Sequence, residues 1–344
     1  MPLSRPATFP LLKLPWLCIK CVLHNSDLVD LIYFASLSNR TRRIVKSSNY
    51  PLKEIDIFPN SSCRRICMGD RRTWHFKHDK YRYGVPLVLE RNSVPFRACR
   101  GFNPDGGHYL HSYTTGDELD ALKMGIDFMI DLFGCKIGYL IIAGDKLSDF
   151  FGLGISTVKE LFIKYPGPVD MTDLNYLLET VNVTDRYVFN VRISGDFYCD
   201  PRFFKCRKLY FGGEHSADWV TLELLCQFDV PQLTFFSHQF SVKDIVSYLT
   251  YWFNSENRKL EYLYVSCNNP VSLEYFKIDH LNPMTFCEKR RNRWTLNKSL
   301  NKTDMSSGKD ILRQDGLLAT FFVESKSVLF YIWHKRFPDA VVHT

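Results

Sequence analysis

The feature that most constrains the fold is a regular alternation of apolar, strand-like runs with amphipathic helical stretches from residue 139 onwards. Six such runs begin 22, 26, 22, 24 and 30 residues apart. Strands that alternate with helices favour parallel pairing and right-handed crossovers. The sequence therefore predicts an α/β domain with strands over 139–142, 161–164, 187–190, 209–212, 233–236 and 263–266.

Amphipathic helices are expected in most of the gaps. The first is predicted over 119–133, after a capping box formed by Thr115 and Glu118 and before Gly134. The later helices are expected to begin at polar cap residues, namely Thr172 or Asp173, Ser216, and Ser241 with Asp244.

A strand–helix period of about 20 to 30 residues is typical of leucine-rich-repeat-like solenoids, in which each unit covers the apolar face of its neighbour. The Asn or Cys position of a standard repeat is missing here, so the repeats would be degenerate. Two interpretations stay open. One is a leucine-rich-repeat-like curved sheet, and the other is a non-repetitive α/β domain with the same order of elements.

The N-terminal residues 9–44 predict three short helices that bury too little surface to be stable alone. Pro15 suits a first helical turn, because the N–H that proline lacks has no helical partner there. Asp27 is placed to cap the second helix, whose apolar stripe starts at Leu28. A basic third helix is expected over 40–46. Some of the apolar side chains must therefore meet a partner.

The rest of the chain predicts β-structure. Between the helices and residue 115, the expected features are an extended segment, a polar linker or loop, a short strand and a further loop, at 53–58, 60–70, 86–89 and 103–107. Near the C-terminus, 287–308 is expected to be an exposed basic loop. It precedes a hairpin with strands over 317–323 and 328–333.

The segment FPLLKLP at residues 9–15, the pair Val22-Leu23 and a Leu-rich helix that ends in SLSNRTRRIV together resemble an F-box. The F-box docks substrate receptors onto the Skp subunit of cullin-RING ubiquitin ligases. The resemblance is greatest to a nematode family that carries its own C-terminal F-box-associated domain of type 2. The sequence departs from the motif at His24-Asn25-Ser26, where an apolar residue such as Met is usual. The residues that the resemblance implies for Skp binding are Leu11, Leu12, Leu14, Pro15, Val22, Leu23, Leu28 and Leu31.

Two further segments are similar to that family's F-box-associated domain. In DIVSYLTYWFNSENRKLEYLYV, residues 244–265, a helix that ends in Trp252 and a polar turn lead into a strand with Leu260 and Leu263. Residues 310–339 resemble the family's closing hairpin. The alternative for the N-terminal helices is a structural cap on the domain behind them, without a partner.

Composition indicates a globular chain, with 45% hydrophobic, 24% charged and 15% aromatic residues. The net charge of +7 permits acidic or phosphorylated partners without requiring them. Basic residues cluster at 64–65, 71–72 and 289–293, but no known DNA- or RNA-binding module accompanies them, so nucleic-acid binding is not expected.

The cysteines favour a reducing compartment. Eleven are present, an odd number without a disulfide framework, which predicts free thiols and a cytoplasmic or nuclear location. Lys13, Lys20 and two prolines interrupt the apolar N-terminus, so a signal peptide is not expected. No run approaches the roughly 18 apolar residues of a membrane span, so no membrane partner is expected.

The sequence holds only weak candidates for catalysis or metal binding, and no cofactor is predicted. Cys18 and Cys21 have redox spacing, but they lie in the first predicted helix, so we expect both thiols to be packing groups. His108 and His111 are interpreted as surface residues of a loop. Phosphate-loop, kinase and nucleophile-elbow motifs are missing. The best zinc candidates, whose spacing does not match a standard finger, are Cys63, Cys67, His75 and His78.

These features predict an F-box-like helical module over 7–52, a connecting segment over 53–114 and a substrate-binding α/β domain over 115–340. The favoured function is a non-catalytic adaptor that binds Skp, and through it a cullin-RING ligase, together with an unidentified protein substrate. No substrate-binding residue is predicted. The alternative is a scaffold or innate-defence binding module that does not engage Skp, and an enzyme is a distant third.

Overall fold

The computed structural model describes residues 11–60, 64–69, 72–78, 85–87, 96–102, 108–114, 116–144, 147–194, 196–213, 217–238, 240–287, 293–294 and 303–334. The chain forms two compact units. The first comprises Met1–Leu140 and Asp149–Gly154, and the second comprises Ile141–Ser148 and Ile155–Thr344. Within the described ranges, every helix is too short or too polar to cross a membrane.

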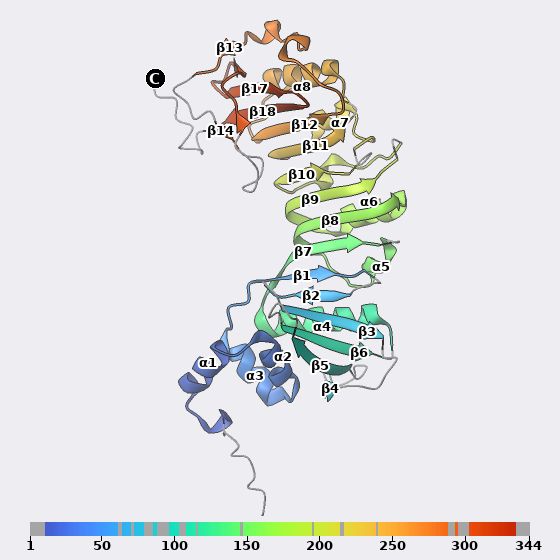
Figure 1. Cartoon of the computed structure of the whole chain (residues 1–344), viewed down its shortest axis with the longest axis vertical. Helices are drawn as coiled ribbons and strands as arrows, with labels where there is room; N and C mark the ends of the chain where they lie inside the picture. Colours follow the sequence, from blue (N-terminus) through green and yellow to red (C-terminus); the bar gives the residue numbers. More distant parts are fainter. Residues whose placement is uncertain are drawn as a thin grey trace, which may run out of the picture. The chain divides into compact units, whose positions relative to one another are not determined.

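The first unit begins with the three predicted helices (Figure 1). A 3-10 turn, η1 (Leu11–Lys13), leads into α1 (Trp16–His24), α2 (Leu28–Ser36) and α3 (Asn39–Ser48). The predicted cap is confirmed, since Asp27 accepts a hydrogen bond of 2.8 Å from the Val29 N–H. Ser38 and Thr41 form a capping box at the start of α3, and the sequence analysis missed it.

The sheet of the first unit has the order β7-β1-β2-β3-β6-β5-β4. Its strands β1 and β7 pair in parallel, as do β3 and β6, whereas the other neighbours are antiparallel. The bounds are β1 (Glu54–Phe58), β2 (Arg65–Cys67), β3 (Arg72–His78), β4 (Val85–Leu87), β5 (Phe96–Phe102), β6 (His108–Thr114) and β7 (Lys136–Ala143).

Helix α4 (Glu118–Phe133) covers one face of this sheet (Figure 1). The buried rings of Trp74 and Phe76 on β3 stack with centroids 5.0 Å apart, and Phe128 of α4 meets the Trp74 ring edge-on at 6.2 Å. Gly125 of α4 lies directly over the Phe76 ring, where a side-chain carbon would come within 2.4 Å of it. The core of the first unit therefore lies between α4 and strands β2, β3 and β6.

Three local predictions for the first unit are wrong. The polar segment 60–70 contains β2, because Ile66 alternates inward and is buried. His108 and His111 lie on β6 and not in a loop. Helix α4 is capped by Asp117, whose side chain accepts the Leu119 N–H at 2.8 Å, and not by Thr115. The predicted end at Gly134 is confirmed, with the positive φ of 64° that glycine favours.

In the second unit, consecutive strands β8 to β12 pair in parallel, which confirms the predicted pairing for these strands. Their predicted first residues stand in one register from Leu161 through Tyr187, Leu209 and Leu233 to Leu263, and all five are buried. The bounds are β8 (Thr157–Pro168), β9 (Asn182–Arg192), β10 (Lys208–Phe211), β11 (Gln232–His238) and β12 (Tyr262–Cys267).

The core of the second unit is rich in stacked aromatic rings. Phe189, Phe211 and Phe235 on β9, β10 and β11 stack in succession, with centroids 5.1 and 4.9 Å apart. Trp219 meets the Phe211 ring edge-on at 6.0 Å. These three phenylalanines occupy the same inward-facing position on neighbouring strands, so their rings stack across the sheet.

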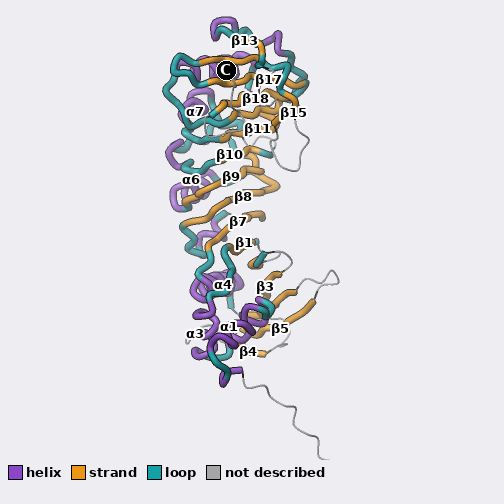
Figure 2. Tube along the Cα trace, turned by 90° about the vertical axis from the view of Figure 1, so that its left-hand side faces the viewer, coloured by secondary structure: helices purple, strands orange, loops and turns teal. Residues whose placement is uncertain are grey.

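Helices lie on one side of the parallel strands in the second unit (Figures 1 and 2). They are α6 (Met171–Thr180), α7 (Leu222–Gln227) and α8 (Val242–Asn254). The 3-10 turn η2 (Pro201–Phe203) precedes β10, and the single turn α5 (Ser148–Phe151) falls mostly in the first unit. The predicted capping box of Ser241 and Asp244 is confirmed. The other two caps were misplaced and are Asp170 for α6 and Thr221 for α7.

An antiparallel part closes the second unit. The predicted hairpin is confirmed, and its second strand pairs with β12. Onward from β12, the sheet order is β18-β17-β16-β13, with bounds β18 (Ser327–Trp333), β17 (Leu318–Glu324), β16 (Lys309–Leu312) and β13 (Met284–Thr285). The 3-10 turns η3 (Leu273–Tyr275) and η4 (Asp279–Leu281) precede β13. A separate pair, β14 (Arg293–Trp294) and β15 (Thr303–Asp304), falls in the predicted basic loop, most of which lies outside the described residues.

The predicted fold class is therefore confirmed at the level of a mixed α/β chain, in which three N-terminal helices precede extensive β-structure with interspersed helices.

Candidate partner-binding surfaces

The eight residues predicted to bind Skp divide between surface and core. Leu23, Leu28 and Leu31 are 1–2% exposed and belong to the core of the first unit. The apolar stripe of α2 is thus its inward face, as expected for an amphipathic helix. The other five lie at the surface, namely Pro15 and Val22, which are exposed, and Leu11, Leu12 and Leu14, which are half-buried.

The sequence analysis missed several other exposed side chains of the N-terminal helices. Trp16 and Leu17 on α1 are 41% and 77% exposed, and Leu37 after α2 is 59% exposed. Cys18 and Cys21 are also exposed, so the expectation that both thiols are packing groups is wrong. Burial of Ile19 and Leu23, four residues apart, sets the inward side of α1 and leaves Leu17, Cys18 and Cys21 outward, whereas Trp16 shares the inward side and is exposed at the start of the helix. That spacing was the signal in the sequence.

The triplet His24-Asn25-Ser26 has a local structural role. The Asn25 amide donates to the Cys21 carbonyl and the Ser26 hydroxyl donates to the Val22 carbonyl, both at 2.8 Å. The His24 ring nitrogen Nε2 lies 2.8 Å from the Ser48 carbonyl at the end of α3. The Cys21 and Val22 carbonyls also accept the Asn25 N–H, so these side chains add second hydrogen bonds at the end of α1, and His24 links α1 to the end of α3.

Ion pairs attach the three helices to the rest of the first unit. Arg42 and Lys46 of α3 both pair with Asp131 of α4, and the Lys46 hydrogen bond is the main cause that lowers the pKa of Asp131. Asp27 pairs with Arg72 of β3 at 3.1 Å. The Arg42 guanidinium also lies 4.8 Å from the centre of the Phe128 ring. These contacts hold the inner side of the helices against α4 and β3, whereas the outer side of α1 is exposed.

A groove of about 750 Å³ lies within the second unit. Its walls come from the segments that precede β10, β11 and β12, at one end of the parallel strands. Acidic and basic side chains both line it, together with the exposed rings of Tyr198 and Tyr251. The charged lining residues are Asp200, Arg202, Asp229, Glu256, Arg258 and Lys259.

Ion pairs join most of these charges. Arg202 pairs with Asp200 at 2.5 Å, and Lys259 pairs with Asp229. Because opposite charges alternate around the groove, it favours neither an anion nor a cation.

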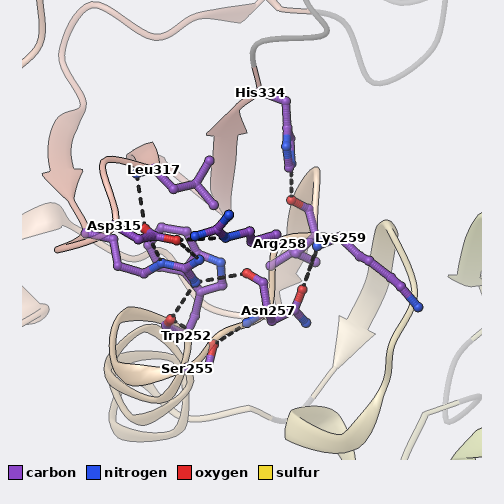
Figure 3. A network of polar contacts seen from close by, with 10 residues as sticks. Trp252, Ser255, Asn257, Arg258, Lys259, Asp315, Leu317 and His334 are labelled. Atoms are coloured by element: carbon purple, nitrogen blue, oxygen red, sulfur yellow. Dashed lines mark hydrogen bonds and ion pairs between the residues drawn. The ribbon is translucent and has the colours of Figure 1, made fainter.

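Beside the groove, a polar network joins the turn between β16 and β17 to the turn between α8 and β12 (Figure 3). Its centre is the guanidinium of Arg313, which is buried. It donates to the Asn257 and Trp252 carbonyls at 2.9 and 3.3 Å. It also binds both carboxylate oxygens of Asp315, at 2.9 and 2.7 Å. Its carbon Cζ lies 5.0 Å from the Trp252 ring centre.

Other polar groups complete this network. Arg258 donates to Asp315 at 3.0 Å, and the pKa of Asp315 lies well below its ordinary range, chiefly because of the Arg313 hydrogen bonds. The Asn257 side chain accepts the Lys259 and Leu260 N–H groups, and His334 contacts the Leu260 carbonyl at 2.7 Å (Figure 3). The turn that forms one wall of the groove is thus held by Arg313 and Asp315 from the turn between β16 and β17, and by His334, which follows β18.

The predicted zinc candidates do not come together where they are described. His75 stands opposite Arg65 in the β2–β3 register, whereas Cys67 stands opposite Thr73, and Cys63 lies outside the described residues. Across the described ranges, no group of three or more potential metal-ligating side chains gathers at one point.

Two segments of the chain match known protein families. Residues 11–53 match the F-box domain, and residues 201–265 match the F-box-associated family. The chain is an F-box protein with an F-box-associated domain. The F-box match covers η1 and α1 to α3, so the exposed outer side of α1 belongs to the F-box. The F-box-associated match covers all lining residues of the groove except Tyr198 and Asp200.

Two relatives come from Caenorhabditis elegans. One, uncharacterized protein F59B2.8, is 23% identical over 362 residues, which span 96% of this F-box protein and 79% of the relative. The other, uncharacterized protein F59B2.9, is 29% identical over 132 residues, which span 36% of this chain and 30% of the relative. No solved structure matches the chain.

Proposed function

We propose that this F-box protein is the substrate-recognition adaptor of an SCF-type cullin-RING ubiquitin ligase. Its F-box would bind the Skp subunit, and its C-terminal domain would bind a protein substrate, without catalysis by the chain itself. The observation that carries this proposal is the outer side of α1, where apolar side chains are exposed within a matched F-box. Contiguous exposed apolar groups mark a protein-binding surface.

The proposed Skp-binding surface differs from the set of eight residues that the resemblance implied, because three are removed and three others are added. It retains Leu11, Leu12, Leu14, Pro15 and Val22 and adds Trp16, Leu17 and Leu37. The buried leucines Leu23, Leu28 and Leu31 would support the surface from behind.

For the C-terminal part we propose a degenerate leucine-rich-repeat-like arrangement, with one repeat for each strand from β8 to β12. The shared register of five buried residues and the helices on one side support it. We also propose three functional segments, namely the F-box-like module over 7–52, a connecting segment over 53–114 and the substrate-binding domain over 115–340. The proposed location is cytoplasmic or nuclear. The compact units divide near residue 140 instead, because β1 pairs with β7 and α4 packs on β3.

The direct test is binding of a purified Skp subunit by the full chain. A Leu14→Asp/Val22→Asp variant places one carboxylate just before α1 and one on α1, and is expected to weaken binding at least tenfold, because charges in an apolar interface are costly to desolvate. The matched control is Leu312→Asp, which changes a leucine that is half exposed in the second unit. Wild-type affinity in the double variant would refute the proposed surface.

The exposed thiols give a second readout. Cys18 and Cys21 should react with a maleimide in the free chain and be protected when Skp is bound, whereas the buried Cys199 and Cys206 should stay unreactive throughout. Burial raises the pKa of both buried thiols to about 12.

The second candidate function is a scaffold or innate-defence binding module that does not engage Skp. The polar triplet His24-Asn25-Ser26 favours it, since it stands where F-boxes usually have an apolar residue. A correctly folded wild-type chain that binds no Skp would select this alternative.

A further inference from the structure

The open face of the first-unit sheet gathers basic and imidazole side chains. On β3, Trp74 and Phe76 point to the core, so the alternating residues His75 and Lys77 point to the other face. The register places His75 between Arg65 of β2 and His111 of β6. We call Arg65, His75, Lys77 and His111 the histidine–cation cluster.

Short distances hold this cluster together. The imidazole rings of His75 and His111 have centroids 5.0 Å apart. His111 packs against the Tyr109 ring at 4.6 Å, and the Arg65 guanidinium lies 4.2 Å from the centre of the Phe58 ring. Aromatic rings therefore lie against the His111 imidazole and the Arg65 guanidinium.

Burial and nearby cations make the two imidazoles costly to protonate. The pKa of His111 falls to about 4, first because of burial, then because of Lys77 and His75. The pKa of His75 is lowered by burial, then by Lys77 and Arg65. Among the described residues, the charged groups that lower these two pKa values are Lys77, Arg65 and the imidazole of His75. An anion between them would oppose all of these effects.

The register places further residues beside the cluster. On β1, Asp56 stands opposite Cys67, not opposite a member of the cluster, and it accepts the Tyr139 N–H at 3.1 Å. On β5, the residues opposite His111 and Tyr113 are Cys99 and Arg97. On β3 and β6, the remaining neighbours are Thr73, 3.0 Å from His75 Nε2, and the hydroxyl of Tyr113, 3.4 Å from His111 Nδ1.

We propose that the histidine–cation cluster binds a tetrahedral oxyanion of the phosphate or sulfate class. Arg65 and Lys77 supply fixed charge, and the two imidazoles supply ring N–H donors. A guanidinium fork and imidazole N–H groups match the oxygens of such an anion. The proposal does not depend on binding to Skp.

The proposed site has a defined pH dependence. A bound dianion raises the pKa of both imidazoles, so the complex takes up protons and the affinity rises as the pH falls. Sulfate is the suitable probe, because it stays a dianion from pH 5 to pH 7. We expect sulfate to bind on the order of tenfold more tightly at pH 5 than at pH 7, which corresponds to a rise of about two pKa units at one imidazole.

The experiment follows the ring C–H signals of His75 and His111 by NMR in the full chain, with sulfate against chloride at equal ionic strength. Sulfate should raise both pKa values. Lys77→Gln should raise them without sulfate and weaken sulfate binding, and His111→Gln should remove most of the pH dependence. The control is Lys243→Gln, which removes an exposed lysine at the start of α8.

Unchanged pKa values with sulfate would overturn the proposal. So would equal weakening by Lys77→Gln and Lys243→Gln, because that pattern means general charge screening. A second arm distinguishes the source of the anion. A phosphoserine peptide that binds more tightly than inorganic phosphate identifies a phosphorylated protein, and equal affinities identify the free ion. Both results support the site.

Discussion

At the scale of single residues, Arg313 is the side chain on which most local contacts depend. Arg313→Met removes four hydrogen bonds and leaves the Asn257 carbonyl without this donor. We expect the free energy of unfolding of the second unit to fall by about 3 kcal/mol, since hydrogen bonds to buried charged groups are strong. Denaturant unfolding, followed by fluorescence, measures the change.

The control for that variant is Arg258→Met. The Arg258 side chain is 73% exposed and binds the same carboxylate. Its loss should cost less than about 1 kcal/mol, as for most surface ion pairs. Equal losses in the two variants would contradict a central role for Arg313.

Asp315 gives a prediction about pH. Its folded-state pKa is lowered by Arg313, so the unfolded chain binds more protons between the two pKa values. The stability that its charge contributes is therefore present at neutral pH and lost as the pH falls below about 4. Asp315→Asn should be less stable than the wild type at pH 7, and the difference should shrink in acid. A difference that grows as the pH falls would contradict this account.

At the scale of elements, the helices of the F-box carry both buried and exposed leucines within a short stretch of sequence. Leu28 is buried in α2, so Leu28→Ala should lower the free energy of unfolding by about 3 kcal/mol. Leu17→Ala, on the exposed side of α1, should change it by less than about 0.5 kcal/mol. Thermal unfolding of the two variants measures the contrast.

The same pair separates folding from binding. At a temperature where both variants are folded, Leu17→Ala should weaken binding to Skp more than Leu28→Ala does. The opposite order would place the binding surface on α2, where the resemblance implied Leu28 and Leu31.

Element positions were largely predictable from periodicity, whereas caps were not. The strands from β8 to β12 and the closing hairpin were found, because one buried position repeats on every strand. The cap at Ser241 was found because Asp244 completes a box. Asp117 and Asp170 were missed because several polar residues stand near each helix start, and local sequence does not select among them.

At the scale of the whole chain, the F-box helices fall within the first compact unit. A chain that starts at Glu54 would lose the contacts of Arg42 and Lys46 with Asp131 on α4. We expect faster hydrogen exchange in α4 and β3, whereas β9 to β11 in the second unit keep their protection. Unchanged exchange in α4 would show that the helices are an independent module.

The sequence by itself determined the three N-terminal helices, the strand–helix alternation, the parallel pairing of β8 to β12 and the resemblance to an F-box. These follow from local periodicity and from motifs that are short in sequence. Only the tertiary structure decided which leucines of the F-box face outward, that Cys18 and Cys21 are exposed, and that β2 runs through an apparent linker. It also decided that Arg313 reaches the Asn257 turn, and that His75 meets His111. The physical reason is that burial and side-chain contact depend on partners many residues away along the chain.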